Sequence, residues 1–295
     1  MPSIVISQLV IVIFIFLGGC SDLGFYWQAA SGHISLLNRK QDIQDLMNSK
    51  NTPSELKRKL KIVESTRSFA KKHLTISLND AYTGYVELER SYVTMIVTAA
   101  KPLELKGYQW CYWFIGCQEY RGFFDEADAN SLASEMRSDN FDVSIRPVIA
   151  YSTLGWLNKS WMPDYFSDPV LSTFLMRHDA DLVATLIHEM AHKIVFLEND
   201  TSFNESFAVF VEKEGLLQFL EQFKNTDLFD HDGEKIFQWY LSARKDRNLF
   251  NELIKNTYFE MKILFASKVS DKEKLLKKEQ LFEKLRENYL NKKKS

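Results

Sequence analysis

The sequence predicts an α+β fold in which a small mixed or antiparallel sheet is followed by a mostly helical C-terminal half. Residues 83–124 and 142–151 are rich in β-branched and aromatic residues, which is typical of strands. Apolar residues recur at helical spacing in residues 25–74 and through most of the chain after residue 182.

Composition limits the architectures and partners that the chain can have. It contains 295 residues, of which 45% are hydrophobic and 14% aromatic, so it can bury a sizeable core. Its formal net charge is −2 and no basic stripe appears apart from a lysine-rich C-terminal end, so nucleic acid is not an expected partner. No sharp change of composition divides residues 20–295, and we expect them to form a single domain without an obligate protein partner.

The N-terminal segment predicts export. Residues 4–17 form an apolar run that is too short to span a bilayer comfortably, so residues 1–19 are predicted to be a signal peptide. No Lys or Arg precedes this run, which leaves an uncleaved membrane anchor as the alternative. The run ends in Leu17-Gly18-Gly19-Cys20, which resembles the lipobox of bacterial lipoproteins, and Cys20 would then carry the lipid.

Two helical stretches and a strand region come next. A break at residues 51–53 separates two helices within residues 25–74, which we expect to pack on the core. Strand-like segments follow at 85–88, 92–97 and 110–115. Cys111 and Cys117 lie close enough in sequence to form a small disulfide loop in an exported protein, and two reduced, buried thiols are the alternative.

A further helix and strand complete the first half. Asp125 is placed to cap a helix over residues 126–137. The strand predicted at 142–151 contains Pro147, and proline is tolerated at the edge of a sheet but not in its interior. An edge strand beside the next helix could hold a peptide as an added strand. The alternative is that Pro147 only protects the edge from aggregation.

Residues 182–195 predict a helix that carries a metal-binding motif. His188 and His192 are four residues apart, so both imidazoles project from one helix face and can share a metal ion. Glu189 lies about 100° further round the helix, where it can act as a general base without ligating. The motif H-E-x-x-H predicts one Zn²⁺ ion, with Glu189 as the catalytic residue.

Catalytic zinc normally takes three protein ligands, so the two histidines require a third. Glu205 is the best candidate, because a short loop at residues 198–202 would turn a second helix back to face the first. Residues 202–205 also resemble a capping box, in which Glu205 would bond the first amide of its own helix. Glu212, two turns further along the same face, is a reserve ligand, although beside Lys213 it is more simply a solvated charge.

The last third of the chain is predicted to be helical at residues 216–223, 234–244, 249–265 and 272–291. Several blocks in order carry a family resemblance: Trp110-Cys111, Gly116-Cys117, and residues 120–127, 150–156, 168–173, 188–192 and 200–208. Together with the lipobox they resemble the bacterial predicted aminopeptidases, a lipoprotein branch of the gluzincin metallopeptidases.

The resemblance implies a zinc-dependent aminopeptidase acting on peptides, with the site residues His188, Glu189, His192 and Glu205. It also indicates candidate substrate-binding residues at Ala150, Tyr151 and Ser152. Ser21 follows the lipidated cysteine, and a residue other than aspartate there resembles the signal for outer-membrane sorting. We therefore expect a lipoprotein of the outer membrane that faces the periplasm of a Gram-negative bacterium.

Two roles in such an enzyme have several candidates. The hydroxyl that would stabilise an oxyanion could come from Tyr151, Tyr240 or Tyr258. An aminopeptidase also needs a carboxylate that holds the free ammonium of its substrate, for which the acidic candidates are Glu119, Asp125 and Glu126. The resembling family extends past the last helix of this chain. The alternative function is therefore a surface lipoprotein whose zinc site is non-catalytic or of the endopeptidase type.

Overall fold

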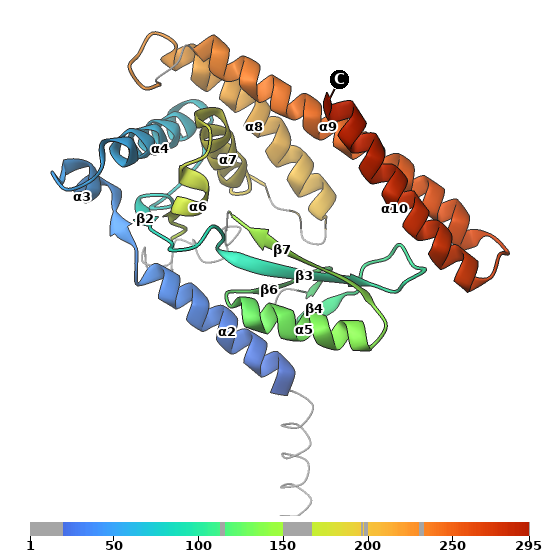
Figure 1. Cartoon of the computed structure of the whole chain (residues 1–295). Coiled ribbons are helices and arrows are strands. Elements are labelled where there is room, and N and C mark those ends of the chain that lie inside the picture. Colours follow the sequence, from blue (N-terminus) through green and yellow to red (C-terminus); the bar gives the residue numbers. More distant parts are fainter. Residues whose placement is uncertain are drawn as a thin grey trace, which may run out of the picture.

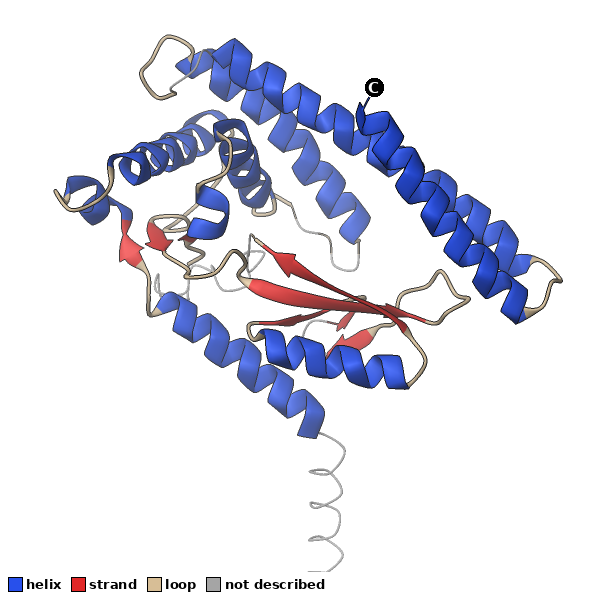
Figure 2. Ribbon diagram, viewed as in Figure 1, coloured by secondary structure: helices blue, strands red, loops and turns tan. Residues whose placement is uncertain are grey.

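Helices surround small sheets of two or three strands, so the fold is mixed α+β, as predicted (Figure 2). Figure 1 shows a computed structural model of the chain, which describes residues 20–112, 116–149, 167–195, 197, 200–229 and 233–294. The helices are α2 (Cys20–Leu37), α3 (Ile43–Asn48), α4 (Ser54–His73), α5 (Glu126–Ser138), α6 (Ser172–Leu175), α7 (Asp179–Ala191), α8 (Thr201–Phe223), α9 (Gly233–Ala266) and α10 (Asp271–Lys294).

The described part of the N-terminal region begins with α2, whose first residue is Cys20. The predicted signal peptide, residues 1–19, lies outside the described residues. Within the described ranges, none of the helices has both the length and the apolar character that a bilayer span requires. Helix α4 begins directly after Pro53, where the sequence predicts a break, since proline can start a helix but cannot continue one.

The strands of the described residues form two three-stranded sheets and one hairpin. They are β1 (Gln41–Asp42), β2 (Gly84–Val86), β3 (Thr94–Ala100), β4 (Trp110–Tyr112), β5 (Gly116–Gln118), β6 (Arg121–Phe123), β7 (Asp142–Val148) and β8 (Val170–Leu171). The first sheet has the strand order β1-β2-β8 and is mixed, because β1 is antiparallel and β8 parallel to β2. The second sheet has the strand order β6-β3-β7 and is antiparallel throughout.

Strand β7 stands at one end of its sheet order and pairs with β3 from Thr94↔Val148 to Ala100↔Asp142. Pro147 lies opposite Met95 in this register. Helix α5 packs on β3 and β7, and these strands separate it from α7 and α8 in Figure 1. The predicted strand residues beyond 149 lie outside the described residues, and the placement of this strand beside the H-E-x-x-H helix stays a prediction.

The hairpin β4–β5 carries the two cysteines. Cys111 and Cys117 are register partners and form a disulfide in the structure. Arg121 at the start of β6 lies 4.2 Å from the ring centroid of Phe25, a cation–π contact that attaches α2 to the sheet.

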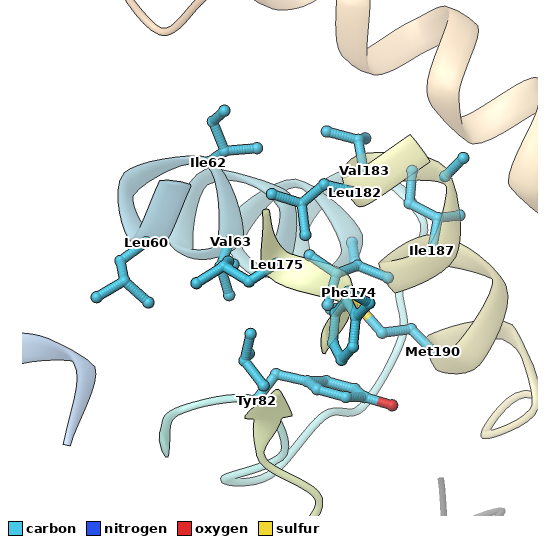
Figure 3. Packing of buried hydrophobic residues seen from close by; sticks show 14 of the residues in the cluster. Leu60, Ile62, Val63, Tyr82, Phe174, Leu175, Leu182, Val183, Ile187 and Met190 are labelled. Carbon is cyan, nitrogen blue, oxygen red and sulfur yellow. The ribbon is translucent and has the colours of Figure 1, made fainter. Parts of the chain in front are cut away.

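The largest core cluster packs α4 and α7 against each other and against the first sheet (Figure 3). Leu60 and Val63 of α4, Leu182 and Ile187 of α7, and Tyr82 ahead of β2 are all at most 1% exposed. Burying a side chain of this size contributes roughly 1.5–3 kcal/mol. The cluster therefore holds α7 rigidly, with its histidines at the C-terminal end.

Residues 233–294 form two long antiparallel helices, α9 and α10, and their connecting turn (Figure 1). The break predicted between residues 244 and 249 is wrong, because α9 is continuous from Gly233 to Ala266. Residues 245–248, Lys-Asp-Arg-Asn, are polar and exposed on α9, and none is a glycine or proline that would end a helix. Lys278 of α10 is buried, and its ammonium donates to the carbonyl of Pro102 and to the carboxylate of Asp142, which attaches α10 to the second sheet.

A buried ion cluster attaches the first turn of α7 to α4. Asp179 accepts hydrogen bonds from Lys59 at 2.6 Å and from Arg58 at 2.7 Å, and Lys59 also bonds the carbonyl of Arg177. Burial alone would raise the pKa of Asp179, but the hydrogen bonds and charges of Arg58 and Lys59 hold it below its usual value. The ionised carboxylate therefore balances the ammonium of Lys59, whose side chain is only 5% exposed.

We expect Asp179→Ala to lower the free energy of unfolding by about 3 kcal/mol, because it leaves the charge of Lys59 buried without its partner. The effect should diminish below about pH 4, since a carboxylate with a lowered pKa stabilises the fold above its unfolded pKa and loses this contribution as it is protonated. Urea unfolding at several pH values measures this. The matched control is Asp227→Ala, which breaks the exposed Lys61–Asp227 pair and should leave the free energy of unfolding close to that of the wild type. Equal losses in the two variants would contradict the account.

Candidate metal centre

Helix α7 places two histidines one turn apart at its C-terminal end. His188 lies in the last turn and His192 is the C-cap residue. Their ring centroids are 5.1 Å apart and the ring planes are inclined by 82°. The side chain of His188 is 18% exposed and that of His192 is 3% exposed, so the pair lies at the boundary between the core and solvent.

Asn204 fastens the short connection between α7 and α8. Its amide group donates to the carbonyl of Leu197 at 2.8 Å and accepts from the amide of Leu197 at 2.9 Å. Asn204 itself is buried. This pair of bonds brings the first turns of α8 against the end of α7 and directs the next residue, Glu205, toward the histidines.

Three potential ligand atoms converge at this point. The Nε2 atom of His188 lies 3.2 Å from Oε2 of Glu205, and Nε2 of His192 lies 3.6 Å from Oε1 of Glu205. One ligand atom from each of the three residues lies within 4.8 Å of the others. A tetrahedral zinc ion with bonds of about 2.0–2.1 Å holds its ligands roughly 3.3 Å apart. The donor set, two imidazoles and one carboxylate, is one that catalytic zinc sites use.

The capping-box interpretation of Glu205 is wrong. The N-cap of α8 is Asp200, whose carboxylate accepts a hydrogen bond from the amide of Phe203 at 2.9 Å. The helix therefore begins before Ser202, and Glu205 lies inside it. Its side chain is 52% exposed and contacts the two histidines.

The interpretation of Glu212 as a solvated charge is also wrong. Glu212 is only 7% exposed, and its Oε2 lies 3.0 Å from Nδ1 of His188. Its Oε1 accepts a hydrogen bond from the hydroxyl of Tyr240 at 3.1 Å. Because Glu212 bonds the ring nitrogen of His188 that faces away from Glu205, it does not belong to the three converging residues.

The two histidines have opposite pKa shifts. Burial lowers the pKa of His188, but the hydrogen bond that His188 donates to Glu212 and the charges of Glu189, Glu212 and Glu205 outweigh it, so the net shift is upward. Burial lowers the pKa of His192, and the charge of Glu205 only partly opposes this. The site therefore attracts a positive charge next to His188, which is the electrostatic condition for cation binding.

Glu189 follows His188 in α7 and is half-buried. Its negative charge is near enough to raise the pKa of His188. It is not one of the three converging residues, as the sequence argument expects of a base that does not ligate.

The residues predicted to stabilise an oxyanion or to bind substrate differ in where the structure places them. Tyr240 is only 2% exposed and bonds Glu212, so its hydroxyl cannot contact a substrate and this assignment is wrong. Tyr258 is 44% exposed on α9. The candidates Ala150, Tyr151 and Ser152 lie outside the described residues.

The acidic candidates for binding a substrate ammonium are not placed at the metal side chains. Asp125 is the N-cap of α5 and accepts a hydrogen bond from the amide of Ala127, and Glu126 accepts one from the hydroxyl of Tyr92. Strands β3 and β7 separate α5 from α7 in Figure 1. Glu119, exposed beside β5, lies next to Gly107 and is not among the three converging residues.

The predictions from the sequence do not include the contacts of Arg244 and Tyr240 with Glu212. Arg244 donates to the hydroxyl of Tyr240 at 2.9 Å and lies 3.6 Å from Oε1 of Glu212. Two spacings could have indicated this group. Glu212 is seven residues after Glu205 and so lies on the same helix face, and Tyr240 and Arg244 are four apart on α9.

The fold and side chains define a mixed α+β protein with a two-histidine, one-glutamate candidate metal centre. A family model described as "Putative aminopeptidase" matches residues 24–295, and the chain belongs to this family. Searches of curated proteins and of solved structures gave no match.

Proposed function

We propose that this protein is a zinc-dependent peptidase that uses His188, His192 and Glu205 as ligands and Glu189 as general base. The observation that carries the proposal is the convergence of three ligand atoms, one per residue, within 4.8 Å of one another. Membership of the aminopeptidase family supports hydrolysis of peptide bonds as the reaction.

Each group in the site has a defined part in this chemistry. When bound, zinc supplies a Lewis acid that polarises a carbonyl and lowers the pKa of water. The carboxylate of Glu189 takes a proton from the attacking water and returns it to the leaving amine. His188, His192 and Glu205 fix the geometry, and the core packing of α7 keeps both histidines and Glu189 in one rigid element.

We further propose that a peptide substrate adds to the edge of β7 that faces away from β3, where no other described strand pairs. The support is that β7 is the last strand of its sheet order and that its side chains are exposed or half-buried from Asp142 to Val148. An extended peptide could bond such an edge through its main chain.

The direction of attack is tested with one peptide offered with a free and with an acetylated N-terminus. We expect single residues to be removed from the free form only, as an aminopeptidase requires. Mass spectrometry of the products measures this. Internal cleavage of both forms would replace the proposal by an endopeptidase, and no cleavage of a diverse peptide library would leave a zinc-binding surface lipoprotein.

Zinc binding is expected to weaken as the pH falls. Ligation needs a neutral imidazole at His188, whose pKa lies above its usual value of about 6.5, so protons compete with zinc below that pKa. The apparent affinity should fall about tenfold per pH unit below the pKa and stay level above it. Titration against a chromogenic chelator, corrected for the protonation of the chelator, measures this. A constant affinity from about pH 8 to 5 would contradict ligation by His188.

We propose that the chain is anchored to the outer membrane through a lipid on Cys20. The support is the segment Leu17-Gly18-Gly19-Cys20 followed by Ser21. Fractionation of membranes should show that Cys20→Ala releases the protein and that Ser21→Asp moves it to the inner membrane. A Cys20→Ala protein with an unchanged membrane profile would show that the lipid is not the anchor.

A further inference from the structure

A chain of polar contacts leads from the candidate metal ligand His188 to helix α9. Nδ1 of His188 bonds Oε2 of Glu212 at 3.0 Å, Oε1 of Glu212 bonds the hydroxyl of Tyr240 at 3.1 Å, and that hydroxyl accepts from Arg244 at 2.9 Å. We propose that Glu212, Tyr240 and Arg244 are positioning residues for the metal centre, so that α9 is part of the site. The inference rests on the proposed zinc site.

The contact at Nδ1 selects the ring nitrogen that is available for a metal. A carboxylate only accepts hydrogen bonds, so when Nε2 ligates a metal the proton of a neutral His188 lies on Nδ1, where Glu212 accepts its hydrogen bond. The lone pair of Nε2 then faces Glu205 and His192, where the ligand atoms converge. A carboxylate behind a ligating histidine fixes the orientation of the ring and increases its basicity. Glu212 meets this description from the neighbouring helix, α8.

Helix α9 supplies what keeps the carboxylate of Glu212 in place. Glu212 is 7% exposed, and an unpaired buried charge would be costly. The guanidinium of Arg244 lies 3.6 Å from Oε1 of Glu212 and provides the opposite charge. The hydroxyl of Tyr240 lies between them, accepting from Arg244 and donating to Glu212. Because the ring of Tyr240 is buried, it has little freedom to release this bond.

A second contact anchors the same turn of α9 to α7. The ring of Trp239 stacks on that of His178, with centroids 3.7 Å apart and planes inclined by 15°. His178 is the N-cap of α7, the helix that carries both histidine ligands. The start of α9 is therefore fixed against the metal-binding helix, which a positioning role requires.

The contacts of Glu212, Tyr240 and Arg244 reach only one of the two histidines, His188. Nδ1 of His192 is buried and makes no hydrogen bond in the described part of the structure, whereas Nδ1 of His188 bonds Glu212. The position of His192 is set by packing, since its side chain is only 3% exposed. Loss of the Glu212 network should therefore disturb ligation through His188.

The test measures zinc affinity in the full mature chain. We expect Glu212→Gln to weaken zinc binding by about 10–100-fold, as the loss of an outer-shell partner does. Tyr240→Phe, which removes one hydroxyl from a buried ring, should weaken it about fivefold, the fold-change that corresponds to one hydrogen bond. Arg244→Met should also weaken it. The matched control Arg247→Met alters an exposed residue of α9 and should bind zinc like the wild type.

Two further readouts separate positioning from structural support. The metal-free variants should unfold at the wild-type temperature or slightly below it, while the visible spectrum of the Co²⁺-loaded Glu212→Gln protein should differ from that of the wild type. If Glu212→Gln does not fold, Tyr240→Phe decides alone. Folded variants with wild-type zinc affinity and spectrum would overturn the inference. A wild-type protein that binds no zinc would instead overturn the proposed function, so the two failures are distinguishable.

Discussion

Replacing Glu189 by glutamine is expected to lower peptide hydrolysis by about 10²–10⁴-fold, the range that a positioned general base contributes. Glutamine has nearly the same shape but cannot take a proton from water. Glu189 is not one of the converging ligand residues, so the variant should retain its zinc. The expected result is a folded, zinc-loaded protein that hydrolyses peptides very slowly.

Steady-state hydrolysis and zinc content of the same preparation are the measurements. A suitable control is Glu214→Gln, which alters a carboxylate of α8 that pairs with Lys213 and should leave both quantities unchanged. If Glu189→Gln lost zinc together with activity, Glu189 would be a ligand or a structural residue. If it kept full activity, another group would have to be the base.

Removing the Glu205 carboxylate should have the largest effect on zinc binding. Glu205→Gln replaces an anionic ligand by a neutral amide, and the loss should exceed the roughly 10–100-fold that an outer-shell partner contributes. Glu205 is 52% exposed and Asp200 caps its helix, so the fold should not depend on it. We expect weak zinc binding, no hydrolysis and an unchanged unfolding transition in the presence of a chelator.

Glu221→Gln is the matched control for this variant. Glu221 lies on the same helix, is 71% exposed and pairs with Lys224. Its replacement should change neither zinc affinity nor hydrolysis. Wild-type zinc affinity in Glu205→Gln would remove Glu205 from the ligand set, and the assignment of the third ligand would have to be revised.

Local patterns made much of this architecture predictable. The helix that carries His188 and His192 follows from its apolar spacing, and the start of α4 follows from Pro53. The position of Pro147 in a strand at the end of its sheet order agrees with the steric limits on proline. Each of these features depends on residues close in sequence, and single-chain patterns record such relations well.

The features that the sequence did not predict depend on contacts between distant residues. The burial of Glu212 depends on Tyr240 and Arg244, which are 28 and 32 positions away along the chain. The spacing from Glu205 makes Glu212 a reserve ligand in the sequence, but only its contacts with α9 distinguish it from a solvated charge beside Lys213. The sequence predicts separate helices at residues 234–244 and 249–265, whereas in the structure the polar residues 245–248 form part of the exposed surface of a continuous α9.

The metal content of the purified wild-type protein tests the central claim most directly. Protein purified without chelators and with zinc in the growth medium should contain close to one zinc ion per chain by plasma mass spectrometry, as a site of two histidines and one glutamate predicts. His188→Ala and His192→Ala, measured in parallel, should contain essentially none. A wild-type protein without zinc that also fails to bind added zinc would contradict the account.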